Sequence, residues 1–363
     1  MDNQQHLLDK VEFYLQNSVA PHAAEIDNNP EALGTALKGL GELNLLALRV
    51  PKEWGGAEVS DETFQNFQEL VARYSGALAF LQTQHQSAAG MLVQSDNSSL
   101  KQEYLPYLGK GEILVGVGFS HLRREGEQPI LAVAVDGGYQ LDGQVPWVTG
   151  FGLFQEFIVA AELPDGRAIF GLLPFVEIYQ EAGGAIRFSK PMELAAIAST
   201  NTVTAQLSNW LLPSDRVISI KPAGWIHEND KNNVLRPTSL ALGCARAGLD
   251  ILSAASYKKS QPFLISAFKL LDEEVINCSI AIRKSQQQSR ASLAEQLQLR
   301  AWAIDLAVRC AHAAVTVSSG AANYSHHPAQ RVYREALVFT VSGQTGALME
   351  ATLARLVRSS FPQ

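Results

Sequence analysis

The spacing of apolar residues changes twice along the chain. In residues 1–110 apolar side chains recur every three or four positions, the period of a helix buried on one face. In residues 111–222 the period falls to two, as at Leu131 and Val133, and Gly and Pro interrupt the runs. From residue 223 to 363 the helical period returns. The pattern predicts an α+β multidomain fold, with an N-terminal helical domain, a central β-barrel-like domain and a C-terminal four-helix bundle.

Two features of the C-terminal part carry further expectations. Apolar residues keep the helical period from Leu337 to Leu356, which predicts one helix and places Gly343 inside it. The preceding stretch, residues 311–317, has more apolar positions than one bundle core needs. Because apolar surface of this kind usually marks a subunit interface, a homodimer or homotetramer is expected.

Composition narrows the class of protein. Hydrophobic residues make up 47% of the 363 positions and charged residues 18%, which is typical of a folded globular chain. The net charge of −7 and the lack of a long basic run argue against nucleic-acid or anionic-membrane partners. No apolar run is long enough to span a bilayer, and no signal peptide is recognisable. Three cysteines without metal-like spacing suit a reducing compartment and no metal site, so a cytoplasmic location is expected.

The segment from Tyr139 to Gly150 is the strongest candidate for a binding site. It follows a turn signal, Asp136-Gly137-Gly138, and has the alternation of a hairpin strand. Trp147 and Thr149 are two positions apart, so on a regular strand they share a face. That face offers a π-surface and a hydroxyl, which suits a flat aromatic ligand with a polar edge. The alternative is that Trp147 is an ordinary core residue and Thr149 an ordinary strand residue.

Four segments, in order along the chain, carry a family resemblance. They are Val50–Gly56, Tyr104–Glu112, Tyr139–Thr149 and Val332–Glu335. Together they resemble motifs of the acyl-CoA dehydrogenase family. The resemblance implies that FAD lies between the β-domain and the bundle, with Trp147, Val148 and Thr149 packed against its isoalloxazine ring. It also implies a small-molecule substrate such as an acyl-CoA.

The catalytic base of that family has no counterpart at the usual places. Relatives use a Glu to remove a proton next to the thioester, and Gly343 falls at that position. Thr345 matches a Thr that contacts the flavin in relatives. Other members place the base on an earlier bundle helix, here near Asn233. Glu228 and Asp230 lie just upstream as substitutes, and the catalytic residue stays unassigned.

The phosphate-binding segment also departs from the family. Ser120 can replace the hydroxyl of a family Thr, but the Gly-rich turn that should follow is absent. Arg123 or Arg124 would bind a phosphate through charge and paired hydrogen bonds; the alternative is an exposed basic loop tip. His121 lies either near the flavin edge or in a structural position.

These observations predict an FAD-dependent oxidoreductase of acyl-CoA dehydrogenase type that lacks the usual base. Two alternatives stay open: a flavin-dependent monooxygenase on the same fold, and a non-catalytic oligomeric scaffold. Dehydrogenation of straight-chain acyl-CoA should be slow or absent. With Gly343 inside a helix, Gly343→Glu is expected to raise turnover.

Overall fold

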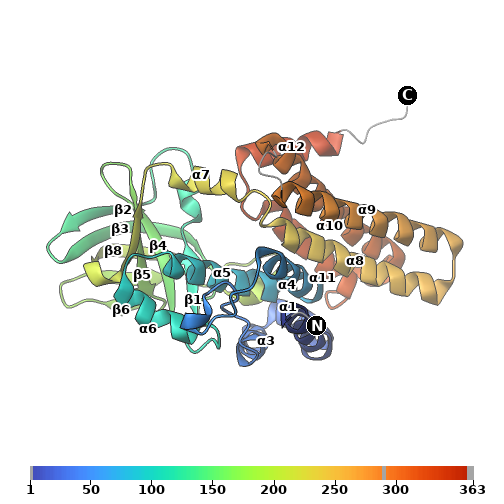
Figure 1. The fold of residues 1–363 in the computed structure, drawn as a ribbon, viewed down its shortest axis with the longest axis horizontal. Coiled ribbons are helices and arrows are strands. Elements are labelled where there is room, and N and C mark those ends of the chain that lie inside the picture. Colours follow the sequence, from blue (N-terminus) through green and yellow to red (C-terminus); the bar gives the residue numbers. More distant parts are fainter. Residues whose placement is uncertain (1–2, 288–291, 358–363) are drawn as a thin grey trace.

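The computed structural model describes residues 3–287 and 292–357. A sheet domain and a helical bundle form the two ends of the molecule, and the N-terminal helices pack against both (Figure 1). Helix gives way to strand between Leu108 and Val115, and strand gives way to helix between Lys221 and Trp225. The predicted order of helical domain, β-domain and helical domain is confirmed.

The N-terminal domain contains six α-helices in its described part. They are α1 (Asn3–Tyr14), α2 (Ala23–Asn28), α3 (Pro30–Glu42), α4 (Asp61–Tyr74), α5 (Gly76–Val93) and α6 (Ser98–Leu108). Between α1 and α2 the chain passes through a π-helical turn and a 3-10 turn that contains Pro21, because proline cannot continue a regular helix. The hydroxyls of Ser60 and Ser75 accept backbone hydrogen bonds at the starts of α4 and α5.

The central domain is built on one nine-stranded mixed sheet. Its strands are β1 (Val115–Gly118), β2 (Ile130–Val135), β3 (Gly138–Val148), β4 (Glu156–Glu162), β5 (Ala168–Pro174), β6 (Ile178–Tyr179), β7 (Ala185–Phe188), β8 (Val203–Pro213) and β9 (Val217–Lys221). Their order is β6-β7-β8-β3-β2-β4-β5-β9, and β1 pairs with β4 in parallel. A Cβ on Gly171 of β5 would lie 2.4 Å from the side chain of Leu212 on β8. Two strands distant in the sheet order therefore face each other, which gives the domain its barrel-like form.

The C-terminal domain contains α7 (Trp225–Asn232), α8 (Thr238–Lys259), α9 (Pro262–Gln287), α10 (Leu293–Ser318), α11 (Pro328–Val341) and α12 (Gly346–Val357). The last two replace the single helix expected from Leu337 to Leu356. Gly343 lies in the link between them with a φ of +62°, a left-handed conformation that favours glycine. The expectation that Gly343 is helical is therefore wrong.

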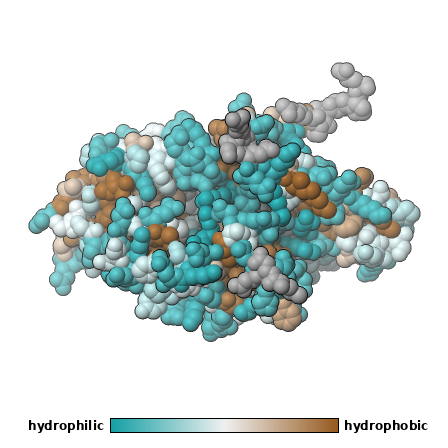
Figure 2. Space-filling model, in the orientation of Figure 1, coloured by the Kyte–Doolittle hydropathy of each residue, from teal (hydrophilic) through white to brown (hydrophobic). Residues whose placement is uncertain are grey.

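The apolar residues at 311–317 are not surplus surface. Ala311, Ala314 and Val317 are buried, and α10 approaches Gly248 of α8 so closely that a Cβ there would clash with the backbone. Exposed apolar side chains of the bundle lie elsewhere, and Figure 2 shows hydrophobic patches on its surface. They belong to α9, α11 and α12: Phe263, Leu270, Ile276, Ile280, Leu337, Val341, Met349, Leu353 and Leu356.

No helix in the described part of the chain has the length and apolarity needed to cross a membrane. The three cysteines, Cys244, Cys278 and Cys310, are buried free thiols. Within the same residues no cluster of His, Cys, Asp and Glu could hold a metal ion.

Candidate functional site at the end of β3

The end of β3 presents one exposed and one buried candidate side chain. Trp147 is 47% exposed, whereas Thr149 is 6% exposed and lies just beyond the last strand residue, Val148. The strand pairing shifts register between Val145 and Val148, where Pro146 has no N–H to donate to the ladder. This irregularity breaks the strict alternation, so the expected shared face of Trp147 and Thr149 is not a regular strand face. The side chain of Val148 is buried in the core, leaving only its main chain for a ligand.

Strand β1 runs across this end of β3 and leads to Ser120. A Cβ on Gly116 would lie 3.2 Å from the carbonyl oxygen of Thr149, and one on Gly118 would lie 3.0 Å from the side chain of Val148. Two glycines thus allow the close approach of the strands. Two residues later, Ser120 is exposed at the start of a 3-10 turn (Ser120–Arg123). The structure therefore brings Ser120 into the neighbourhood of Val148.

A chain of buried hydroxyls continues inward from Thr149. The Oγ1 atoms of Thr149 and Thr202 are 3.0 Å apart, and those of Thr202 and Thr200 are 3.4 Å apart. The Thr200 hydroxyl donates to the carbonyl oxygen of Ile197 at 2.8 Å. All three threonines are at most 6% exposed. Thr200 and Thr202 could not be identified from the sequence, because a hydrogen-bond partner 53 residues away leaves no local signal.

The loop that carries these threonines is held in an unusual conformation. Ile197 and Asn201 have φ values of +53° and +46°, and a left-handed conformation is a real outlier for a β-branched residue. The backbone N–H of Ile197 donates to Asp27 of α2 at 2.8 Å, and the Ser199 hydroxyl donates to the carbonyl oxygen of Ile26. Main-chain bonds from Gly150 and Phe151 reach residues 200 and 201. The loop is therefore fixed from both the N-terminal helices and the β3 end.

The motif Val332–Glu335 completes this clamp from α11. Arg334 forms a 2.7 Å ion pair with Asp27, which is 1% exposed, and also donates to the carbonyl oxygen of Ala195. Glu335 is fully buried, accepts from the backbone N–H of Gly76 at the start of α5, and pairs with Arg331 at 2.6 Å. Burial raises the pKa of Glu335, while the Arg331 guanidinium acts against that rise. These contacts join the bundle to the N-terminal domain and give the motif a structural role.

The two carboxylates considered as substitute bases have other partners. Asp230 is 17% exposed and forms a paired contact with Arg123, with N–O distances of 2.7 and 2.8 Å. Glu228 is exposed and pairs with Lys231 at 2.6 Å. The contact with Asp230 also commits the guanidinium of Arg123, so Arg124, which is exposed, is the freer of the two candidates for a phosphate.

A buried arginine contacts both segments in which the family resemblance led us to expect the base. Nη2 of Arg300 donates to the carbonyl oxygens of Ser342 at 2.8 Å and Gly343 at 3.1 Å. Nη1 donates to the carbonyl oxygen of Val234, next to Asn233. Arg300 is 7% exposed, and burial lowers its pKa to about 10 while the nearby Asp230 acts in the opposite direction. A Cβ on Gly343 would meet only this guanidinium, at 3.2 Å.

Thr345 lies two residues beyond this contact. Its Oγ1 accepts from the backbone N–H of Leu348 at 3.2 Å and so caps the start of α12. On one side of the domain junction Arg123, in the Ser120 turn, pairs with Asp230, and within the bundle Arg300 binds the carbonyl oxygens of Ser342 and Gly343, just before Thr345. Within the described residues, no hydrogen bond or ring contact joins Thr345 to Trp147.

The two buried histidines have structural partners. His85 donates from Nε2 to the carbonyl oxygen of Leu108 and accepts from the N–H of Val115 at Nδ1, and burial lowers its pKa to about 4. His121 lies 3.0 Å from the carbonyl oxygen of Ala160 through Nε2, and burial lowers its pKa to about 4 as well. Both rings are neutral near pH 7, so neither supplies a positive charge to the site.

The residues at the β3 end fit a flat ring system. In the described part of the chain, the exposed indole of Trp147 stacks on no other ring and lies under no cation. The neighbouring Thr149 hydroxyl has another hydroxyl as its hydrogen-bond partner, which leaves it capacity for one more. An exposed aromatic surface and, two residues on, a hydroxyl with spare hydrogen-bonding capacity suit the ring and the polar edge of a flavin.

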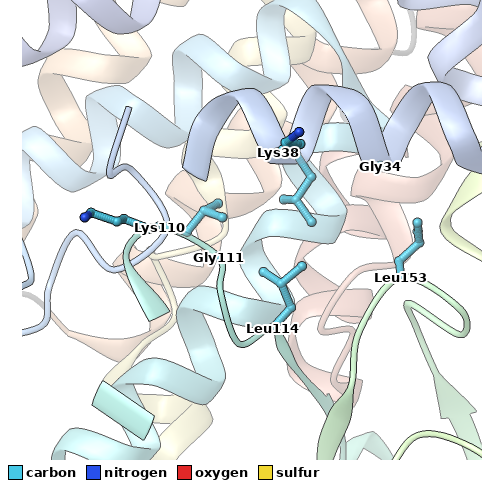
Figure 3. A pocket seen from close by; sticks show the side chains of 8 residues that line it. Gly34, Lys38, Lys110, Gly111, Leu114 and Leu153 are labelled. Atoms are coloured by element: carbon cyan, nitrogen blue, oxygen red, sulfur yellow. The ribbon is translucent and has the colours of Figure 1, made fainter. Parts of the chain in front are cut away.

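A separate hollow of about 200 Å³ lies between α3 and the β-domain loops. Figure 3 shows Leu114 and Leu153 facing it from the β-domain side, while the amino groups of Lys38 and Lys110 point away. None of the predicted site residues lines it. Without converging polar groups it does not have the features of a ligand site.

Comparison with known proteins agrees with the fold and the motifs. The acyl-CoA dehydrogenase N-terminal domain matches residues 1–112. A probable acyl-CoA dehydrogenase of Bacillus subtilis, YngJ, is 21% identical over 97% of both chains, and a mitochondrial isovaleryl-CoA dehydrogenase of Solanum tuberosum is 26% identical over 60% of this chain and 54% of its own length. Butyryl-CoA dehydrogenase from Megasphaera elsdenii shares the fold over 99% of both chains, with a TM-score of 0.80 and 18% identity. The domain match over residues 1–112, the full-length relatives and the shared fold all show similarity to the acyl-CoA dehydrogenase family.

Proposed function

We propose that this protein is an FAD-dependent oxidoreductase of acyl-CoA dehydrogenase type whose site has lost the usual carboxylate base. The observation that supports flavin binding is that an exposed indole, Trp147, and a hydroxyl with free hydrogen-bonding capacity, Thr149, lie two residues apart at the end of β3. The similarity of this chain to proteins named as acyl-CoA dehydrogenases supports an acyl thioester as the substrate class.

Each candidate residue has a task that its position allows. Trp147 offers its face to the isoalloxazine ring, and Thr149 offers a hydrogen bond to the ring edge. Ser120 and Arg124 are exposed polar groups suited to the phosphates, and Thr345 holds the start of α12, whose N-terminal N–H groups favour negative charge. A bound flavin supplies the capacity to take up a hydride equivalent; the protein's part is to orient the reactants and exclude water.

Proton removal is the step that this chain supports poorly. Gly343 has no side chain to accept a proton, Asp230 is held by Arg123, and Glu228 is an exposed partner of Lys231. The buried cation of Arg300 at Gly343 would also keep a nearby carboxylate ionised and weakly basic. Dehydrogenation of a straight-chain acyl-CoA is therefore slow.

The lack of a positioned base also favours a second candidate, a monooxygenase that uses reduced flavin and oxygen. That chemistry does not need a carboxylate to remove a proton next to a thioester. The absence of a base at Gly343 counts in its favour, whereas the similarity to named dehydrogenases counts for the first candidate.

Flavin titration tests the cofactor. Wild-type protein should bind FAD saturably, with quenching of flavin fluorescence, and Trp147→Ala should weaken binding by about tenfold, the loss expected for one aromatic contact. Tyr179→Ala is the matched control, because Tyr179 is an exposed aromatic residue elsewhere on the β-domain (66% exposed). Equal binding by Trp147→Ala and wild type would remove Trp147 from the site. No binding by wild type at millimolar FAD would favour the non-catalytic scaffold.

Two reactions then separate the catalytic candidates. Under anaerobic conditions, an acyl-CoA should bleach the bound flavin of a dehydrogenase, slowly here. With chemically reduced flavin and oxygen, a monooxygenase should consume oxygen in a substrate-dependent way. Rapid bleaching by a simple acyl-CoA would mean that a carboxylate outside Gly343 and Asn233 acts as the base.

A further inference from the structure

Three threonine hydroxyls form a hydrogen-bonded chain that runs inward from Thr149. The direction in which Thr200 donates is fixed, whereas Thr202 can donate in either of two directions. A carbonyl oxygen cannot donate, so the Thr200 hydrogen is committed to the carbonyl of Ile197. Thr202 then has two neighbours that can accept from it: Thr149 at 3.0 Å and Thr200 at 3.4 Å. Rotation of the hydroxyl hydrogens of Thr202 and Thr149 moves the chain between two hydrogen-bond arrangements without moving a heavy atom.

The two arrangements give Thr149 opposite character. When Thr202 donates to Thr149, the Thr149 hydrogen is released to donate to a ligand. When Thr202 donates to Thr200, Thr149 can donate to Thr202, and its lone pairs accept from a ligand. With a ligand bound at Thr149, neither arrangement leaves a hydroxyl hydrogen of the three threonines unpaired, which matters because all three are at most 6% exposed.

We propose that Thr202 and Thr200 are positioning residues that let Thr149 donate to an oxidised flavin and accept from a reduced one. This proposal rests on the proposed function, since it requires a bound flavin. The central ring of a flavin exposes a nitrogen lone pair when oxidised and an N–H when reduced, so a partner that can reverse its polarity suits both forms. Only hydroxyl hydrogens reorient, and no covalent bond of the protein changes.

The contacts that hold the loop also keep the three threonine hydroxyls in place relative to one another. Asp27 holds the N–H of Ile197, whose carbonyl oxygen is the fixed acceptor, and Arg334 holds Asp27 in turn. The left-handed backbone at Ile197 is part of what presents that carbonyl to Thr200. The strain of the loop therefore has a consequence for the polarity of the site.

Thr202→Val tests the proposal, because it keeps the shape and removes the hydroxyl. In the reduced complex the Thr149 hydrogen would have no acceptor, whereas in the oxidised complex it would still point to the flavin. Binding of reduced FAD should weaken about tenfold relative to oxidised FAD, which lowers the flavin midpoint potential by about 30 mV. Thr200→Val should shift the potential in the same direction, and Thr202→Ser should restore the wild-type value.

The control is Thr204→Val on β8, two residues beyond Thr202, because the Thr204 hydroxyl donates to the carbonyl of Pro146 outside the chain of threonines. It should leave the potential unchanged. Thermal unfolding of each flavin-free variant separates folding damage from the redox effect. If Thr202→Val and Thr200→Val weaken the binding of both flavin forms equally, with no change in potential, the threonines are structural only and the proposal is overturned. Failure of wild-type protein to bind any flavin would instead refute the proposed function.

Discussion

Nη2 of Arg300 donates to the carbonyl oxygen of Gly343 at 3.1 Å, so a guanidinium is bound to the main chain at the position where the sequence led us to expect a carboxylate. The same group reaches the carbonyls of Ser342 and Val234. One arginine on α10 thereby ties together both segments in which a base was expected.

This contact changes the expected outcome of Gly343→Glu. A non-glycine residue at a φ of +62° costs about 1–2 kcal/mol, and the new carboxylate would lie beside Arg300. The cation lowers the pKa of such a carboxylate and makes it a weak base. We therefore expect little gain from Gly343→Glu alone, and at least tenfold higher turnover from Gly343→Glu/Arg300→Met. Anaerobic acyl-CoA assays with an artificial electron acceptor measure both.

Arg300→Met alone is the control for that pair, since it removes the cation without adding a base. It should not raise turnover. Because it leaves three carbonyl oxygens without a donor, its thermal unfolding must be compared with that of the double variant. Equal activity of the single Gly343→Glu and the double variant would show that Arg300 does not suppress the base.

The buried ion pair between Arg334 and Asp27 should dominate the link between bundle and N-terminal helices. Arg334→Leu leaves the carboxylate of Asp27, which is 1% exposed, without its cation, and should lower the free energy of unfolding by about 3 kcal/mol. The matched control is Arg283→Leu, whose pair with Glu62 is exposed on both sides and should contribute less than about 1 kcal/mol. Urea unfolding compares the two variants, and a similar loss in both would contradict the prediction.

The neutral histidines should make the fold sensitive to mild acid. Burial lowers the pKa of His121 to about 4, below its value in the unfolded chain, so the folded state binds fewer protons. The stability from this residue is present above about pH 6.5 and is lost as the pH falls toward 4. Between pH 7 and 4.5 we expect His121→Leu to lose about 2 kcal/mol less stability than wild type. Parallel losses in the two proteins, measured by urea unfolding at both pH values, would contradict this.

The exposed apolar residues of α11 and α12 should mark the surface between subunits. Leu337 and Leu353 are 53% and 56% exposed, and large apolar side chains exposed in number on bundle helices are usually covered in an assembly. Light scattering should give a dimer or tetramer for wild type and a smaller species for Leu337→Glu/Leu353→Glu. Leu131→Glu, on β2 and 53% exposed, is the control and should leave the mass unchanged. A wild-type monomer at micromolar concentration would exclude the assembly.

Periodicity predicted the order of helical and β segments because each long element buries one face. It failed at Gly343, since Leu337, Val341, Leu348 and Leu353 keep the helical period straight through the break. What ends α11 there is not in that pattern: a left-handed glycine held by an arginine 43 residues away. Tertiary contacts of this kind leave no local trace in a sequence.

The site was predictable where its residues are adjacent and not where they meet through space. Trp147 and Thr149 lie close together because two positions along a strand cannot separate them far. Their differing exposure follows from the irregular pairing at Pro146 and from the strand's end at Val148. Thr202 comes from the loop just before β8 and Arg300 from α10, and nothing in their own neighbourhoods distinguishes them from other threonines or helix arginines.

The carboxylate of Asp27 has a further consequence for how this chain can be dissected. It binds the Ile197 amide of the β-domain with one oxygen and Arg334 of the bundle with the other. A fragment that begins after α2 would leave a cation and a strained loop without their shared anchor. Slow deuterium uptake at the Ile197 amide would therefore report the integrity of all three domains together, and loss of that protection would signal their separation before any of them melts.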